Sequence, residues 1–92
     1  MKVYTYLLKS LKDEKYYVGI TNDINRRLFE HNNGKLLTTA KRRPFSLVYY
    51  KTHENYLEAR NHEKWLKKKN KEYKNKLVEV TQLAPPEIGG VK

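Results

Sequence analysis

The stretch KVYTYLLK at residues 2–9 constrains the fold most, because it carries apolar or aromatic side chains on both of its faces. Successive side chains of an extended strand point to opposite faces. The two sets that this alternation separates are Val3, Thr5 and Leu7 on one face and Tyr4, Tyr6 and Leu8 on the other. Such a strand belongs in a sheet with apolar residues on both faces, and we expect helices to cover both.

The remaining elements follow from periodicity and capping. Residues 16–20, YYVGI, read as a second strand, and the short polar link at 10–15 favours an antiparallel hairpin. The elements predicted after this hairpin are a helix from Asn22 or Asp23 to Asn33-Gly34, a basic loop over 34–44, a strand over 45–51, a helix over 55–69 capped by Asn55 and a short helix over 70–80. The order β-β-α-β-α-α predicts an α/β (α+β) fold, with a small three-stranded antiparallel sheet flanked by helices.

The length of 92 residues predicts one domain, over 1–80, and the Pro-Pro and Gly-Gly pairs predict a flexible tail over 81–92. The chain has no cysteine, which excludes disulfides, thiolate metal sites and cysteine nucleophiles. No apolar run approaches the roughly 18–20 residues of a membrane span, and the N-terminus lacks the apolar core of a signal peptide. We therefore expect a soluble cytoplasmic protein.

The charge predicts a polyanionic partner. Twenty Lys and Arg residues stand against ten Asp and Glu residues, which gives a net charge of +10 and a pI of about 9.8. A domain this basic favours nucleic acid first and an anionic membrane second. The candidate contacts to nucleic acid, which would reach phosphates without sequence preference, are Lys41, Arg42, Arg43, Lys64, Lys67, Lys68 and Lys71. The alternative is a helix face whose lysines are only solvated.

The first helix has a polar interruption on the face that should be apolar. Ile24, Leu28 and His31 lie at helical spacing, with Arg27 on the same stripe. Burying an unpaired guanidinium is expensive, so this arginine needs a carboxylate partner, an anionic ligand in a cleft, or a path to water. The planar fork of arginine suits phosphate, to which it donates two parallel hydrogen bonds. Periodicity alone leaves these alternatives open.

The second helix carries a comparable interruption at Glu63. Its predicted inner face combines Ala59, His62, Glu63 and Leu66. A glutamate in such a place is a salt-bridge partner or a metal ligand. Mg²⁺ keeps several waters when it binds to proteins, so a single carboxylate and a substrate phosphate can be enough to hold it.

Three tyrosines, Tyr4, Tyr6 and Tyr17, lie on strand faces that can adjoin across the predicted hairpin. Core packing explains them without any chemistry. A tyrosine hydroxyl accepts a proton only if its pKa falls well below about 10 or if it relays the proton onward, and a nearby Arg27 would favour the fall. Gly19, beside Tyr17, leaves room for a backbone or a ligand to come close.

These residues together resemble the GIY-YIG nuclease family, in particular its small stand-alone bacterial members of the UPF0213 type. Tyr17-Val18-Gly19 matches the second half-motif, and Tyr6, eleven positions earlier, matches the tyrosine of the first. The stretch YVGITNDINRRLFEH fits the family pattern Y-[IV]-G-x-[TS]-x-D-x-x-x-R-x-x-x-H. This match places the family's arginine on Arg27 and its histidine on His31.

The resemblance covers residues 2–78 and includes one departure. Tyr4 and Thr5 stand where the first half-motif has glycine and isoleucine, as in other stand-alone members. The spacing Ala59-x-x-x-Glu63 matches the family's metal-binding glutamate. Family members often use an asparagine after this glutamate, and the two available, Asn70 and Asn75, give no firm match.

The resemblance implies metal-dependent hydrolysis of a phosphodiester. Glu63 would hold one Mg²⁺ or Mn²⁺ on the scissile phosphate, and Arg27 would stabilise the charge that develops in the transition state. Tyr6 or Tyr17, with His31, would activate the attacking water.

The leading hypothesis is an endonuclease-type domain that acts on DNA rather than RNA and follows structure or damage rather than sequence. A chain of 92 residues leaves no room for a separate DNA-recognition domain, so we expect loose specificity or a protein partner, and a monomer. The alternative is a nucleic-acid-binding module on the same fold with little or no catalysis, although binding alone needs no inward glutamate. A basic protein of an anionic membrane or of the ribosome would explain the charge but not these residues.

Overall fold

The structure is a computed structural model that describes residues 2–81. Its elements are β1 (Val3–Ser10), β2 (Tyr16–Thr21), α1 (Ile24–Asn32), the short 3₁₀ turn η1 (Ala40–Arg42), β3 (Phe45–His53), α2 (Tyr56–Lys67) and α3 (Lys71–Thr81). This order confirms the predicted α+β fold with β-β-α-β-α-α connectivity. Thr81, which the sequence places in a flexible tail, is the last residue of α3, and the rest of that predicted tail lies outside the described residues.

The sheet has the strand order β2-β1-β3, and β1 pairs antiparallel with both neighbours. Its register places Tyr6 opposite Gly19 of β2 and opposite Tyr50 of β3. Leu8 lies opposite Tyr17, so Tyr6 and Tyr17 are diagonal neighbours on one face of the sheet. The two-sided strand at residues 2–9 is therefore the central strand.

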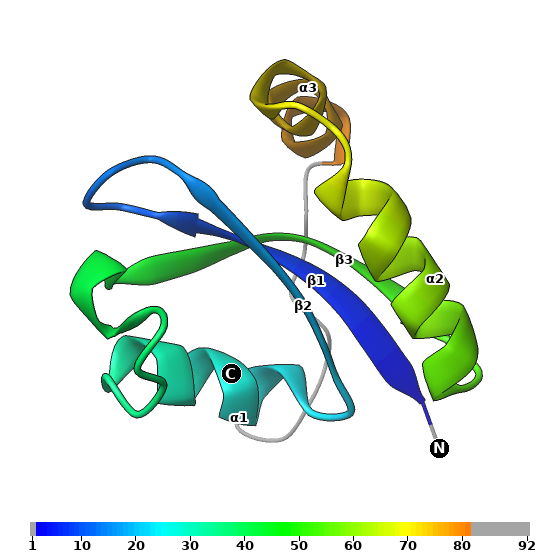
Figure 1. The fold of residues 1–92 in the computed structure, drawn as a ribbon, viewed down its shortest axis with the longest axis horizontal. Coiled ribbons are helices and arrows are strands. Elements are labelled where there is room, and N and C mark those ends of the chain that lie inside the picture. The colour runs from blue at the N-terminus through cyan, green and yellow to red at the C-terminus, as the bar shows by residue number, and fades with distance from the viewer. Residues whose placement is uncertain (1, 82–92) are drawn as a thin grey trace.

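Helices cover both faces of the sheet, as the two-sided strand predicts. On one face, Tyr6, Leu8 and Phe45 form a core cluster against which Leu28 of α1 packs. On the other face, Leu7 and Val18 pack with Leu66 of α2, and residues of α3 extend this cluster. Figure 1 shows α1 and α2 on opposite sides of the sheet. Side chains that face α1 and side chains that face α2 are thus separated by the thickness of one sheet.

Local capping explains where α1 begins and ends. The side chain of Asp23 accepts a hydrogen bond from the backbone N–H of Arg26 at 3.0 Å, which makes Asp23 the N-cap. After Asn33, Gly34 has φ = 71° and its N–H donates to the carbonyl of His31 at 3.3 Å. The predicted start and stop are both confirmed, whereas the predicted loop over 34–44 contains the turn η1.

Candidate active site

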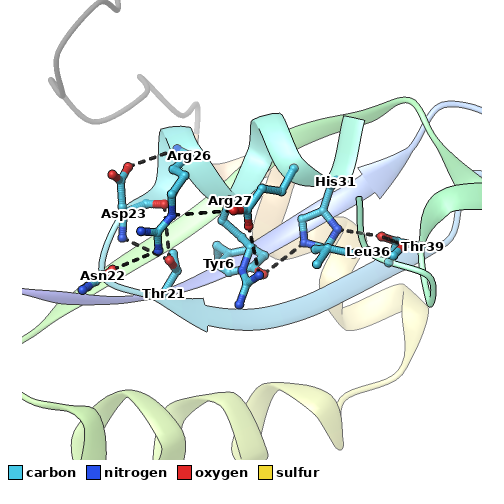
Figure 2. A network of polar contacts seen from close by, with 10 residues as sticks. Tyr6, Thr21, Asn22, Asp23, Arg26, Arg27, His31, Leu36 and Thr39 are labelled. Atoms are coloured by element: carbon cyan, nitrogen blue, oxygen red, sulfur yellow. Dashed lines mark hydrogen bonds and ion pairs between the residues drawn. The ribbon is translucent and has the colours of Figure 1, made fainter. Parts of the chain in front are cut away.

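Three side chains from three parts of the chain form a continuous buried contact on the α1 face of the sheet (Figure 2). The hydroxyl of Tyr6, on β1, lies 3.2 Å from Nε2 of His31 in the last turn of α1. Nδ1 of the same ring lies 2.8 Å from Oγ1 of Thr39, just before η1. His31 and Thr39 are both 0% exposed, and Tyr6 is 3% exposed. Because all three side chains are buried, this contact forms only when the protein is folded.

Aromatic rings hold the imidazole of His31 in place. Its ring centroid lies 5.0 Å from that of Tyr17, 5.6 Å from that of Phe45 and 6.0 Å from that of Tyr6. The contacts with the two tyrosines are edge-on, a favourable geometry for aromatic pairs. The structure therefore brings together Tyr6, Tyr17 and His31, three of the residues singled out in the sequence.

Gly19 has a different role from the one expected. We predicted that its missing side chain leaves room for a backbone or a ligand. A Cβ built at this position would instead lie 2.5 Å from the hydroxyl and 2.6 Å from Cζ of Tyr6. The phenol of Tyr6 therefore fills the space over Gly19, which lies opposite it across the hairpin.

Arg27 lies on α1, one turn before His31, at the edge of the same face. Its side chain is 35% exposed, and Nη1 donates to Oε1 of Glu30 at 3.1 Å. The Nε–H is buried and has no hydrogen-bond partner. Figure 2 shows the guanidinium directed toward Tyr6. Glu30 is thus a carboxylate partner for Arg27, but it leaves one buried donor of the guanidinium unsatisfied.

Of the two conditions under which a tyrosine accepts a proton, a lowered pKa or a relay of its own proton, the structure excludes the first for Tyr6. Burial raises the pKa of Tyr6, and the nearby Tyr17 and Glu63 raise it further when they are ionised. The guanidinium of Arg27 acts in the opposite direction but does not outweigh burial. Tyr6 is therefore a neutral phenol near neutral pH. Tyr6 can therefore accept a proton from water only if it gives its own O–H proton to another group at the same time.

The pKa of His31 is shifted in the direction that keeps its imidazole neutral. Burial, and then the positive charge of Arg27, lower the pKa of His31 to about 4, while the carboxylate of Glu30 opposes the shift. The imidazole is therefore neutral at physiological pH. One of its two ring nitrogens is then free of hydrogen and can accept a proton.

This shift predicts a pH-dependent stability. The unfolded chain binds a proton at His31 as pH falls below the usual pKa of 6.5, whereas the folded chain does so only near 4. The free energy of unfolding should therefore fall as pH drops through this interval, by about 3 kcal/mol from His31. Urea unfolding of wild type and His31→Gln between pH 7 and 4.5 measures it. Wild type should lose more stability, and equal losses would contradict the prediction.

Glu63 lies on α2, which covers the other face of the sheet (Figure 1). Its side chain is 18% exposed, and Oε2 lies 3.3 Å from Nζ of Lys67 one turn later. Its carboxylate is nevertheless near enough to the phenol of Tyr6 to contribute to the raised pKa described above. The charge of Glu63 is thus felt at Tyr6, although Glu63 belongs to the helix on the other face of the sheet.

A metal ion at this site would depend on Glu63. Among residues 2–81, no group of three or more His, Cys, Asp or Glu side chains could hold a metal ion by itself. A single carboxylate is a hard oxygen donor, and Mg²⁺ or Mn²⁺ commonly completes such coordination with water and a substrate phosphate. The donor set therefore fits a metal that binds together with a phosphate.

The basic candidates lie on different elements (Figure 1). Six of them are exposed: Lys41, Arg43, Lys64, Lys67, Lys68 and Lys71. Arg42 instead holds η1 against the hairpin, because it pairs with Asp13 at 3.2 Å and donates to the carbonyl of Tyr16 at 3.3 Å.

No helix within residues 2–81 combines the length and the apolar character needed to cross a membrane.

Asn70 and Asn75, the two asparagines available to match the family's asparagine, both make hydrogen bonds away from the Tyr6 site. Asn70 accepts a hydrogen bond from the backbone N–H of Tyr73 at 2.8 Å, at the start of α3. Asn75 accepts one from the hydroxyl of Tyr16.

The sequence analysis missed two residues of the site, Thr39 and Glu30. Glu30 could have been found, because it lies three positions after Arg27, whereas no motif marks Thr39.

Known proteins match this chain over most of its length. The model of the GIY-YIG catalytic domain family matches residues 2–77. A UPF0213 protein of Clostridium perfringens is 41% identical over 76 residues, which cover 82% of this chain and 81% of that protein. A UPF0213 protein of Streptococcus pneumoniae is 37% identical over 82 residues, or 88% of this chain and 82% of that protein.

A solved structure agrees with these matches. The solution NMR structure of a UPF0213 protein from Bacillus halodurans matches with a TM-score of 0.54 and 34% identity. The match covers 87% of this chain and 85% of that one. The half-motifs around Tyr6 and Tyr17 therefore indicated the correct family: this chain belongs to the GIY-YIG nuclease superfamily, among its UPF0213-type members.

Proposed function

We propose that this protein hydrolyses phosphodiester bonds in DNA with one divalent metal ion, Mg²⁺ or Mn²⁺. The observation that carries the proposal is the buried Nε–H of Arg27, which has no partner although its side chain is partly open to solvent. A buried unsatisfied donor costs about 1–3 kcal/mol, so a native protein retains one where it serves a purpose. A phosphate oxygen would satisfy this N–H and meet the charge of the guanidinium.

Glu63 is the residue that would hold the metal. When bound, the metal would polarise the phosphate and stabilise the leaving oxygen. The carboxylate would have to exchange its ion pair with Lys67 for the metal, and Lys67 is exposed enough to turn away. Arg27 would bind the phosphate from the α1 side and stabilise negative charge as it develops there.

Tyr6 is the better candidate of the two tyrosines for activating water. Its hydroxyl contacts a neutral histidine nitrogen, so it has an outlet for its own proton. Tyr17 packs its ring against His31 with the centroids 5.0 Å apart, which supports a positioning role. His31 in this account takes up the proton that Tyr6 releases.

The substrate we propose is DNA with a distinct shape, such as a branch, a flap or a damaged site. The exposed basic side chains are mainly lysines, which bind the phosphate backbone as point charges and carry no base readout. Specificity would then come from the shape of the DNA or from a protein partner. A monomer suffices for this chemistry, because Tyr6, Arg27, His31 and Glu63 all come from one chain.

Cleavage assays test the proposal directly. Labelled branched, single-stranded and duplex DNA, with matched RNA, would be incubated with the protein and Mg²⁺, Mn²⁺ or EDTA. We expect metal-dependent cleavage of at least one DNA form and no cleavage in EDTA. Salt-sensitive binding of every form without cleavage would reject the nuclease and support the binding module instead.

A further inference from the structure

We propose that Thr39 is a positioning residue that holds His31 in the tautomer protonated on Nδ1, so that the bare Nε2 accepts the proton of Tyr6. The catalytic consequence rests on the proposed nuclease function, whereas the tautomer itself does not. The proposal follows from the direction in which hydrogen bonds can run through three buried side chains. Nothing in the family match identifies Thr39, which lies in the loop before η1.

The chain of contacts ends on a group that can only accept. The hydroxyl of Thr39 can direct its hydrogen toward the backbone carbonyl of Leu36, which lies 3.5 Å from Oγ1. This is a weak contact, because O–H···O hydrogen bonds usually span about 2.5–3.0 Å. With its hydrogen directed there, Oγ1 is an acceptor toward Nδ1 of His31 at 2.8 Å. Nδ1 then carries the proton, and Nε2 is left as an acceptor for the hydroxyl of Tyr6 at 3.2 Å. Every hydrogen in this arrangement has an acceptor.

The opposite direction leaves a buried donor without a partner in the site. If Thr39 donated to Nδ1, then Nε2 would carry the proton and donate to the oxygen of Tyr6. The O–H of Tyr6, which is only 3% exposed, would have to point elsewhere, toward the guanidinium of Arg27, which cannot accept it. Buried polar hydrogens are nearly always paired in proteins, so the first direction is favoured.

The backbone around Thr39 fixes the position of its hydroxyl. The N–H of Thr39 donates to the carbonyl of Leu36 at 3.1 Å, and the N–H of Arg42 donates to the carbonyl of Thr39 at 2.9 Å. Arg42 is in turn tied to Asp13 of the hairpin loop at 3.2 Å. The loop that carries Thr39 is therefore tied to the hairpin through Arg42, and the side chain of Thr39 is fully buried.

This tautomer makes Tyr6 a relay with a balanced proton path. A water proton moves to the oxygen of Tyr6 while the O–H proton of Tyr6 moves to Nε2 of His31. The hydroxide oxygen forms a bond to phosphorus, the ester P–O bond breaks, and its electron pair stays on the leaving oxygen, which takes a proton from solvent. After the product leaves, His31, now an imidazolium, returns its extra proton to the oxygen of Tyr6, which releases a proton to solvent in turn. Tyr6 ends as the neutral phenol that it was.

The test reads the tautomer directly and needs neither DNA nor metal. Long-range ¹H–¹⁵N NMR at about pH 7 would be recorded on ¹⁵N-labelled wild type, with His31→Gln identifying the His31 signals. We expect a proton on Nδ1 in wild type and in Thr39→Ser, which keeps the hydroxyl. In Thr39→Val, which keeps the shape but lacks the hydroxyl, we expect the population with the proton on Nε2 to rise. Thr38→Val, at an exposed neighbour, should match wild type.

The outcomes separate the two proposals. An Nε2–H tautomer in wild type, or an Nδ1–H tautomer that persists unchanged in Thr39→Val, overturns the role of Thr39 whether or not the protein cleaves DNA. If wild type cleaves DNA, Thr39→Val should lose at least about tenfold in rate and Thr39→Ser should recover most of it. If wild type shows the Nδ1–H tautomer but no cleavage, only the nuclease proposal fails. Should Thr39→Val not fold, the wild-type and Thr39→Ser spectra still decide the tautomer.

Discussion

Replacement of Arg27 by alanine is expected to slow DNA cleavage by about 100- to 1,000-fold. The loss follows from the role proposed for the guanidinium, because removing one preorganised donor from a developing oxyanion has this magnitude. The folded state should suffer little: Nε has no partner to lose, and the ion pair with Glu30 is partly exposed, so the free energy of unfolding should change by no more than about 1 kcal/mol. Single-turnover cleavage and urea unfolding measure the two effects separately.

A neighbouring arginine provides the matched control. Arg26 is also on α1 and also lies near Glu30, at 3.9 Å, but its side chain is 55% exposed. Arg26→Ala removes the same charge and should leave the cleavage rate within about twofold of wild type, apart from weaker binding at low salt. Arg27→Lys keeps the charge without the fork and should remain strongly impaired. Equal losses in Arg26→Ala and Arg27→Ala would show that charge alone matters and would contradict a specific phosphate contact.

Replacement of Glu63 by glutamine should abolish metal-dependent cleavage, with a loss of at least about 100-fold. Glutamine has nearly the same shape but carries no charge, so it is a poor ligand for Mg²⁺ or Mn²⁺. The ion pair with Lys67 is lost as well, but Lys67 is 57% exposed and pairs spaced i,i+4 on a helix contribute only about 0.3–0.5 kcal/mol, so the protein should stay folded. Cleavage would be measured over a range of Mn²⁺ concentrations.

The control for this variant lies on the same helix. Glu58 is exposed in the first turn of α2, and Glu58→Gln should cleave DNA like wild type. Binding of DNA in EDTA should be unchanged in Glu63→Gln, or slightly tighter because a negative charge is gone. Cleavage by Glu63→Gln at the wild-type rate would exclude Glu63 as the metal ligand and would point to a contaminating nuclease or to another donor.

Much of this site could be predicted from the sequence because its parts lie on regular elements. Alternation along residues 2–9 separates Tyr6 from Leu7, and helical spacing places Arg27 and His31 on one stripe of α1. The caps at Asp23 and Gly34 fix the ends of that helix. Alternation, helical spacing and capping depend only on residues close together in the sequence, so a single sequence is enough to predict them.

Other parts could not be predicted because they depend on packing between elements. The contact of Thr39 with His31 is a tertiary contact from a loop, which periodicity does not describe. A nearby Arg27 favours a lower pKa for Tyr6, but only the folded core reveals that burial, which raises this pKa, is the larger effect. The role of Gly19 likewise depends on which ring lies over it across the hairpin.

The central position of β1 has a consequence for local opening of the structure and for amide hydrogen exchange. Strands paired on both sides and covered on both faces are the last to open, so their amide hydrogens exchange with solvent mainly through global unfolding. Tyr6 is in the middle of such a strand, and amide exchange at this residue should report the stability of the whole domain. A substitution that loosens β1 would then raise exchange everywhere at once, because the strand that carries the phenol is also the one that holds the two helix layers together.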